Sequence, residues 1–282
     1  MFKIKKYIPD IVVAIILIAG IGLLAYPTIG DYINALHSSK AIGSYVEKTK
    51  DLSKEEKENL LREAREYNES LVGKVNRYYL NEEEKKRYAH ILDITKTGIM
   101  AYVEIPKLNI YMPVYHGTDE GVLQIAAGHL PGSSLPVGGE NTHSLISGHR
   151  GLPSAKLFTD IDKLKKGDLF FIHVFDEVLA YKVNQIKIVL PDDVETLEIE
   201  KGKDYVTLIT CTPYGVNSHR LLVRGERTVY KQSESKIEDM IKKNNLKYIM
   251  LTAEVILALI GMTVLVSVFL IKRRKRRKLN EK

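Results

Sequence analysis

The chain has one cysteine and no tryptophan. The scarcity of cysteine limits which compartments and functions are possible for the protein. With Cys211 as the only thiol among 282 residues, no disulfide can form within the chain. A chain without disulfides fits a reducing compartment, whereas an exported chain with a single thiol retains it for reactivity. A third interpretation is a small buried hydrophobic residue, a common place for a free cysteine. The membrane topology and the sequence around Cys211 distinguish between these three interpretations.

Clusters of metal ligands and phosphate-binding loops are also missing. None of the eight histidines occurs in a pattern with the spacing of a metal site. The stretch 132–139 is rich in Gly, Ser and Pro, but it has no Gly-Lys-Ser/Thr and so does not resemble a nucleotide loop. We therefore expect neither a metal nor a cofactor.

Net positive charge is confined to the two ends of the chain. The net charge is +7, of which residues 1–10 carry +2 and residues 272–282 carry +7, so the remainder is slightly acidic. Both basic ends adjoin apolar runs. This distribution indicates orientation in a membrane rather than binding to nucleic acid.

The first apolar run, Ile11 to Tyr26, has 16 residues and extends to residue 29 if Pro27, Thr28 and Ile29 are included. About 20 residues cross a bilayer core, so the segment 11–29 is predicted to be a transmembrane anchor. The alternative is a signal peptide cleaved near the small residue Ala35. Both a transmembrane anchor and a signal peptide imply that the segment after it is exported.

The second run, Tyr248 to Ile271, has 24 residues and is followed at once by a basic tail at 272–282. A nuclear-localisation or lipid-binding patch is the alternative for such a tail. Its position against a full-length apolar run favours a stop-transfer helix at 248–271. The positive-inside rule then puts both tails, 1–10 and 272–282, in the cytoplasm and the middle of the chain outside.

Residues 30–97 have helical patterns. Ser53 followed by Glu56 forms a capping box, and an apolar stripe follows at Leu60, Ala64, Tyr67 and Leu71. Asn81 with three glutamates predicts a second helix start. We expect a helical stalk whose stripe packs on the domain that follows.

From residue 98 to residue 230 the pattern changes to short strands separated by turn residues, with a short helix expected at 119–127 and a polar linker at 231–247. Close spacing of short strands predicts a barrel or a sandwich. The expected strands are 99–105, 110–115, 143–147, 169–174, 178–189, 205–210 and 219–229.

The single thiol follows one of these strands. Thr207-Leu-Ile-Thr-Cys211 is succeeded by a Thr-Pro-Tyr-Gly turn, and Arg220 begins the returning strand. A sulfur and a guanidinium are therefore expected at one rim of a sheet.

This stretch resembles the Thr-Leu-x-Thr-Cys signature of sortases, with Arg220 in the place of their catalytic arginine. Cys-Thr-Pro-Tyr-Gly and Asn217-Ser-His-Arg-Leu221 resemble the pilin-polymerising class C branch, and Ser147-Gly-His149-Arg resembles the sortase histidine site. The resemblance covers residues 98–230. It implies a mostly β fold, a closed eight-stranded β-barrel, at a Gram-positive cell surface, with catalytic residues His149, Cys211 and Arg220.

The activity that the resemblance implies is cysteine transpeptidation. Cys211 would attack the Thr–Gly bond of a Leu-Pro-x-Thr-Gly-like sorting signal, His149 would protonate the leaving amine, and Arg220 would stabilise the oxyanion. A lysine amine of another pilin subunit would then resolve the thioester. The expected partners are therefore pilin or surface-protein substrates and the lipid bilayer, without nucleic acid.

Other residues compete for these roles. His149 follows a predicted strand and a glycine, where catalytic groups are often presented. His219 is its main rival, although it and Arg220 must face opposite sides of a strand. Arg224 shares the face of Arg220 and is the fallback, while His129 is expected to be a hydrogen-bonding loop residue. His37, His90, His116, His143 and His173 have no supporting context.

Many class C sortases carry an Asp-Pro-aromatic lid before the barrel, and this chain has no Asp-Pro at all. Residues 72–97 are the remaining candidates to cover the site, with no plugging residue assigned. Three other functions stay open: a sortase that anchors proteins to the cell wall, a secreted cysteine hydrolase, and a non-enzymatic membrane-tethered β-domain.

Overall fold

The structure is a computed structural model that describes residues 8–230 and seven isolated residues beyond them. The chain divides into two units, one comprising residues 33–231 and the other residues 1–32 with 232–282. The predicted linker and second transmembrane helix fall outside the described residues, apart from Met250, Ala253, Glu254, Leu257, Gly261, Ile271 and Lys272.

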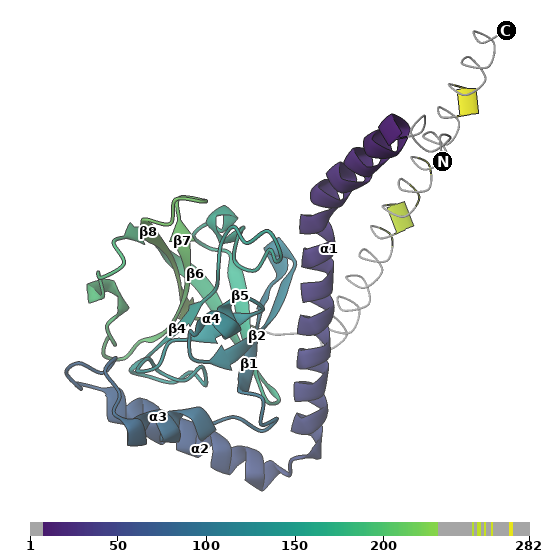
Figure 1. The fold of residues 1–282 in the computed structure, drawn as a ribbon. Helices are drawn as coiled ribbons and strands as arrows, with labels where there is room; N and C mark the ends of the chain where they lie inside the picture. Colours follow the sequence, from purple (N-terminus) through teal and green to yellow (C-terminus); the bar gives the residue numbers. More distant parts are fainter. Residues whose placement is uncertain are drawn as a thin grey trace, which may run out of the picture. The chain divides into compact units, whose positions relative to one another are not determined.

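The larger unit is built around a closed barrel of eight strands in the order β1-β2-β3-β4-β7-β8-β6-β5 (Figure 1). Two pairs, β2 with β3 and β4 with β7, are parallel, and the other neighbours are antiparallel. The bounds are β1 Ile99–Ile105, β2 Ile110–His116, β3 Ala127–His129, β4 Thr142–Ser147, β5 Leu169–Val174, β6 Glu177–Val189, β7 Asp204–Thr212 and β8 His219–Arg227.

The implied barrel is confirmed, and seven of its strands lie where the sequence predicts them. The eighth, β3, has three residues and was not predicted, because so short a strand shows no alternation. The expected helix at 119–127 is only α4 (Glu120–Leu123), and Ala127 already belongs to β3. The short helices η2 (Pro106–Leu108), η3 (Ile161–Lys163) and η4 (Glu195–Leu197) complete the barrel connections.

Three helices precede the barrel: α1 (Ile8–Asp51), α2 (Lys54–Leu71) and α3 (Glu82–His90). The predicted capping box at Ser53 with Glu56 is present, and the predicted helix start at Asn81 also has a capping box, with Glu84. A capping box satisfies two backbone N–H groups that the first turn leaves unpaired. These local signals explain why α2 and α3 begin where they do.

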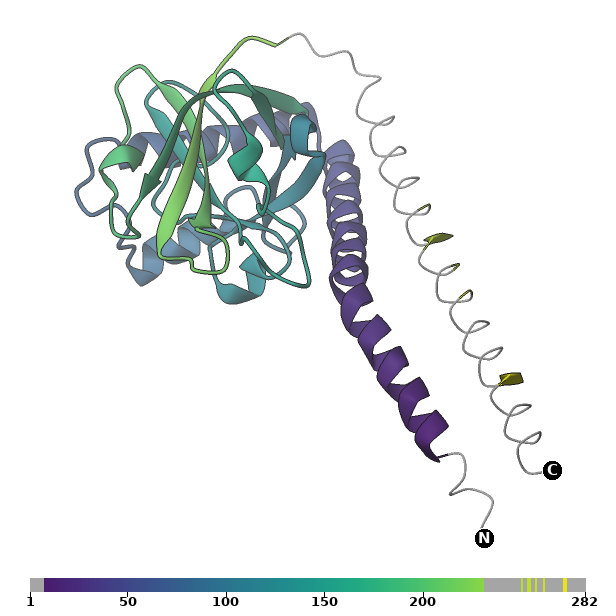
Figure 2. The same ribbon diagram turned by 90° about the horizontal axis from the view of Figure 1, so that it is seen from above.

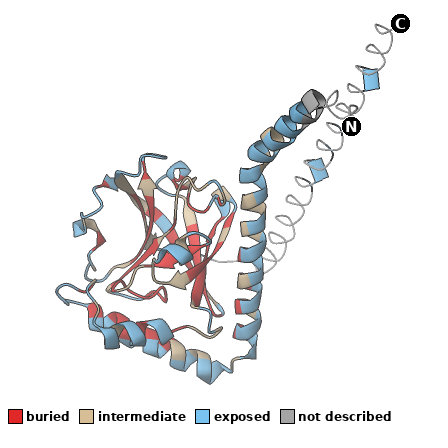
Figure 3. Ribbon diagram, viewed as in Figure 1, coloured by how far each residue is buried: buried red, intermediate tan, exposed pale blue. Residues whose placement is uncertain are grey.

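The helices contribute to the hydrophobic core of the barrel, and the apolar stripe packs on this domain as predicted. Ala64, Tyr67 and Leu71 of the predicted stripe are buried, with Leu61 rather than Leu60 completing the buried face (Figure 3). Asn68 exchanges two hydrogen bonds with the backbone of Leu135, in the loop that leads to β4. This buried pairing holds α2 against the 132–139 loop.

The part of α1 in the larger unit runs along the outside of the barrel (Figures 1 and 2). Tyr45 is fully buried; its hydroxyl donates to the carbonyl oxygen of Met100 at 3.1 Å and accepts from the backbone N–H of Phe175 at 2.9 Å. Burial raises the pKa of Tyr45, so the hydroxyl remains a neutral donor. One side chain therefore ties α1 to two strand regions.

Among the described residues, one helix is long and apolar enough to cross a membrane. It is the stretch Ile15–Asp51, whose most apolar 18-residue window has a mean hydropathy of 1.5 and no buried residue. It contains most of the segment predicted to be an anchor.

Candidate active site

Cys211 lies inside β7, one residue before the strand ends, and Arg220 of β8 is its direct cross-strand partner. Both residues are half-buried. Opposed residues of an antiparallel pair have Cβ atoms about 5 Å apart on the same face. The free thiol and the guanidinium therefore meet on one face at the end of the barrel, as the sequence predicts.

The turn after β4 holds His149 beside Cys211. The hydroxyl of Thr210 donates to the carbonyl oxygen of Gly148 at 2.7 Å, and the guanidinium of Arg150 donates to the hydroxyl oxygen of Thr212 at 3.3 Å. The residues on both sides of Cys211 are thus bonded to the residues on both sides of His149. Sequence reasoning did not assign this bracing role to Thr210 or Arg150, although both lie within the quoted motifs.

Position 148 is a glycine because the Phe158 ring occupies the space that a side chain there would need. A Cβ at this position would lie 2.7 Å from the Phe158 ring. The backbone N–H of Gly148 donates to the carbonyl oxygen of Ile209, which continues the β4–β7 ladder by one residue. The N–H of Phe158 in turn donates to the carbonyl oxygen of His149 at 3.1 Å. The backbone around the histidine is therefore fixed on both sides.

Cys211 and Arg220 share one face of the sheet. Residues two apart on a strand face the same side, so Ile209 lies on the face of Cys211, and Leu222 lies on the face of Arg220. These two belong to a separate apolar cluster with Leu145, Val189 and Leu197. This apolar cluster, called the floor below, lies on the same sheet face as Cys211 and extends up to the thiol.

The segment 72–81, between α2 and α3, covers part of this floor. Tyr78 packs on the cluster, and the nearly buried Arg77 donates to the carbonyl oxygen of Leu197 at 2.7 Å and pairs with Glu198 at 3.2 Å. A pocket of about 750 Å³ separates residues 73–79 from residues 191–199. The segment is therefore strapped to the β6–β7 loop.

The rival residues are held elsewhere. Arg224 pairs with Glu200 at 3.0 Å and lies over the ring of Tyr205 at 4.0 Å. His219 is opposite Thr212 in register, and its Nδ1 is 2.9 Å from the hydroxyl of Ser218. The guanidinium of Arg220, by contrast, donates to the carbonyl oxygens of two residues close to it in sequence, Asn217 in the β7–β8 turn and His219 at the start of β8.

Three other histidines are buried structural residues. His129 lies in β3 and not in a loop, which corrects the sequence-based expectation; its imidazole contacts the Tyr88 hydroxyl at 2.9 Å. Burial lowers the pKa of His129 to about 3 and that of His143 to about 4. His173 forms a buried pair with Glu104 at 2.7 Å. Sequence cannot reveal such pairs, because the partners are far apart in the chain.

One further charged residue reaches the site without any sequence signal. The carboxylate of Glu120, in α4, lies 3.5 Å from Nε2 of His149. Within the described residues, no three His, Cys, Asp or Glu side chains gather as they would around a metal.

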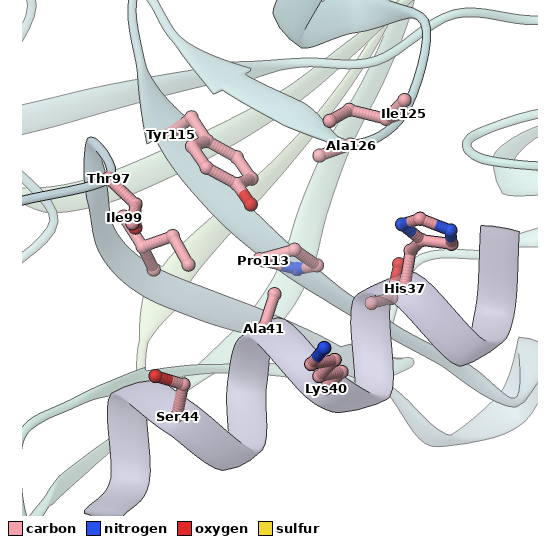
Figure 4. Close-up of a pocket in the computed structure, with 11 residues that line it drawn as sticks. His37, Lys40, Ala41, Ser44, Thr97, Ile99, Pro113, Tyr115, Ile125 and Ala126 are labelled. Atoms are coloured by element: carbon pink, nitrogen blue, oxygen red, sulfur yellow. The ribbon is translucent and has the colours of Figure 1, made fainter. Parts of the chain in front are cut away.

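A separate pocket of about 270 Å³ lies between α1 and the strands β1 and β2 (Figure 4). Its lining includes His37, Lys40 and Tyr115, but none of the three candidate residues. The three candidate catalytic residues therefore lie outside this pocket.

A family profile for the sortase domain matches residues 103–228. A solved structure of sortase C1 from Streptococcus agalactiae is 49% identical, with a TM-score of 0.66, and the match covers 68% of this chain and 100% of that one. The chain belongs to the sortase family.

Other relatives refine this assignment. The crystal structure of sortase C from Streptococcus pneumoniae is 47% identical, with a TM-score of 0.62, over 69% of this chain and 99% of that chain. Sortase A of Bacillus anthracis is 31% identical over 47% of this chain, and the chain spans only 61% of that curated relative. The similarity to the sortase C structures supports class C for this sortase.

Proposed function

We propose that this sortase is a membrane-anchored extracellular cysteine transpeptidase in which Cys211 is the nucleophile, His149 the general acid and base, and Arg220 the oxyanion ligand. The observation that carries the proposal is the geometry of one sheet face: a thiol opposite a guanidinium, with a histidine braced beside the thiol. The similarity to sortase C1 and sortase C structures, at 49% and 47% identity, supports the proposed transpeptidase activity.

The first half-reaction forms a thioester. The Cys211 thiolate attacks the Thr–Gly carbonyl carbon of a Leu-Pro-x-Thr-Gly-like signal, while the Arg220 guanidinium donates hydrogen bonds to the oxygen that becomes negative. The C–N bond breaks as the imidazolium of His149 gives its proton to the leaving amine. A planar guanidinium suits this task because its donors form a fixed fork.

The second half-reaction selects the product. An incoming amine attacks the thioester, the new C–N bond forms, and the Cys211 thiolate leaves. Because the structural relatives are sortases C1 and C, and the Streptococcus pneumoniae enzyme has a pilin substrate specificity, the accepting amine proposed here is a lysine of another pilin subunit. The product is then an isopeptide-linked fibre rather than a free acid.

Placement at a membrane is part of the same proposal. The helix within Ile15–Asp51 has the length and composition of a span, and both basic ends of the chain adjoin apolar runs. Both termini are cytoplasmic and the barrel is outside, so that Cys211 meets cell-surface substrates.

The test uses the full-length protein in detergent with a sorting-signal peptide and a pilin substrate. Mass spectrometry should show the peptide, cleaved after threonine, joined to Cys211, and gels should show a ladder of pilin polymers. Cys211→Ala should remove both products. Arg220→Lys should slow thioester formation about 100-fold, because a point charge does not replace the fork.

Arg224→Lys is the matched control, because Arg224 is held by Glu200 and Tyr205. It should leave the acylation rate within about twofold, well inside the effect expected of a catalytic donor. Polymer formed by Cys211→Ala would end the proposal. Acid product without polymer would instead identify a hydrolase, and transfer only to a cell-wall amine would identify a wall-anchoring sortase.

A further inference from the structure

Glu120 places a carboxylate next to the candidate general base. Its Oε2 lies 3.5 Å from Nε2 of His149, while its Oε1 accepts a hydrogen bond from the amide of Gln124. Glu120 is the first residue of α4, a four-residue helix between β2 and β3. It comes from a different part of the chain than β4, β7 and β8, which supply the three candidate residues.

The two groups differ in how they face solvent. The Glu120 side chain is 72% exposed, whereas Nε2 of His149 is buried and makes no hydrogen bond in the described structure. The hydrogen bond from Gln124, together with the nearby His149, holds the pKa of the Glu120 carboxyl below its usual range. An ionised, largely exposed carboxylate therefore lies beside a buried nitrogen of the candidate general base.

Glu120 has no evident structural role. It does not cap α4, whose N-cap is Asp119, and its side chain makes polar contacts with Gln124 in the next turn and with His149. An exposed carboxylate of this kind contributes little to folding stability. Its position next to the base suggests a functional role instead.

The resolving amine has to overcome a charge problem. A lysine side chain has a pKa near 10.4 and arrives as an ammonium ion, which is not a nucleophile. It must reach the neutral imidazole of His149, lose a proton there and attack the thioester. The positive guanidinium of Arg220, the cross-strand partner of Cys211, repels such a cation, so a negative charge 3.5 Å from His149 favours its approach.

We propose that Glu120 is the acceptor-specificity residue of this site: its carboxylate receives the ammonium group of the incoming lysine and directs it to His149. The inference rests on the transpeptidation proposed above. Two protons leave the ammonium nitrogen as the C–N bond forms and the C–S bond breaks. One returns through His149 to the Cys211 thiolate, and the other goes to solvent.

A role limited to orienting His149 predicts a different result. Such a role would slow aminolysis by every amine, whatever its charge, and would slow thioester formation as well. A steering role lowers the preference for cationic acceptors over neutral ones. The ratio of the two aminolysis rates therefore separates the two roles.

The experiment uses full-length protein in detergent that has first formed the thioester with a sorting-signal peptide. The acceptors are a lysine derivative blocked at its α-amine, which is a cation, and hydroxylamine, which is largely uncharged near neutral pH. Glu120→Gln should lower the lysine-to-hydroxylamine rate ratio about tenfold, and Glu120→Lys should lower it further. Ionic strength near 1 M, where the screening length is about 3 Å, should bring the wild-type ratio toward that of Glu120→Gln.

Glu140→Gln makes the same charge change at an exposed loop residue and should leave the ratio unchanged. A ratio that is unaltered in Glu120→Gln, or that falls equally in Glu140→Gln, would overturn the inference and leave the transpeptidase intact. Failure of the wild-type protein to form any thioester would instead refute the proposed function itself.

Discussion

At the scale of single residues, the site depends on side chains that hold other side chains. Thr210 and Arg150 contact the turn around His149 and the end of β7, respectively, and Phe158 occupies the space beside Gly148. A hydrogen bond of this kind contributes about 1 kcal/mol to stability. Its larger effect here is to fix an imidazole beside a thiol, since catalysis is sensitive to small displacements of the reacting groups.

Two buried histidines predict how stability depends on pH. In the unfolded chain a histidine has a pKa near 6.5, whereas burial lowers the pKa of His129 to about 3 and that of His143 to about 4. Below pH 6.5 the unfolded state therefore binds more protons than the folded state. The stabilisation is complete above that pH and is lost as the pH falls through the folded-state pKa, about 4 for His143 and about 3 for His129.

Urea unfolding of the full-length protein, followed by circular dichroism between about pH 7 and pH 5.5, measures this effect. Each of the two histidines should cost about 1.4 kcal/mol of unfolding free energy per pH unit below its unfolded pKa. His143→Gln should reduce the slope, and the exposed His90→Gln is the control that should not. A stability that does not fall over this range would show that these histidines are not held neutral.

At the scale of elements, the segment 72–81 is the candidate cover of the sheet face that carries the thiol. It lies over the same apolar face that ends at Cys211, and Arg77 straps it to the β6–β7 loop through Leu197 and Glu198. Gly132 allows a close approach at its other side, because a Cβ there would lie 2.2 Å from the carbonyl oxygen of Arg77. The segment can therefore act as a cover without the Asp-Pro-aromatic motif.

Removing the Arg77 contacts tests whether the segment 72–81 covers the thiol. Arg77→Ala should raise the rate at which Cys211 reacts with a bulky thiol reagent several-fold relative to a small one, because the buried guanidinium no longer holds the loop. Lys85→Ala, which removes only an exposed pair with Glu82, should leave both rates unchanged. Equal acceleration of the bulky and small reagents would argue against a cover, and circular dichroism would confirm that the variant is folded.

At the scale of the whole molecule, the single native cysteine makes topology measurable. In a Cys211→Ala background, Glu140→Cys reports on the barrel and Lys282→Cys reports on the basic tail. A membrane-impermeant maleimide should label the first in intact cells and the second only after lysis, because the positive-inside rule retains the tail in the cytoplasm. Labelling of Lys282→Cys in intact cells would contradict the proposed orientation.

Local patterns were sufficient for much of the fold. The capping box at Ser53, the helix start at Asn81 and the strand patterns of the barrel depend on neighbours in sequence, and the structure confirms them. The three-residue strand β3 was missed, and His129 was assigned to a loop, because pairing with β2 and β4 rather than its own residues makes it a strand.

The sequence by itself determined the chemistry: one thiol, a following turn, an arginine on the returning strand and basic ends beside apolar runs, all of them local in the chain. Only the tertiary structure decided which groups meet. The register of β7 and β8 placed Arg220 rather than Arg224 opposite Cys211. Tertiary packing brought Glu120 close to His149 and Arg77 close to Leu197. Such contacts depend on packing between distant segments, and no pattern of neighbouring residues encodes them.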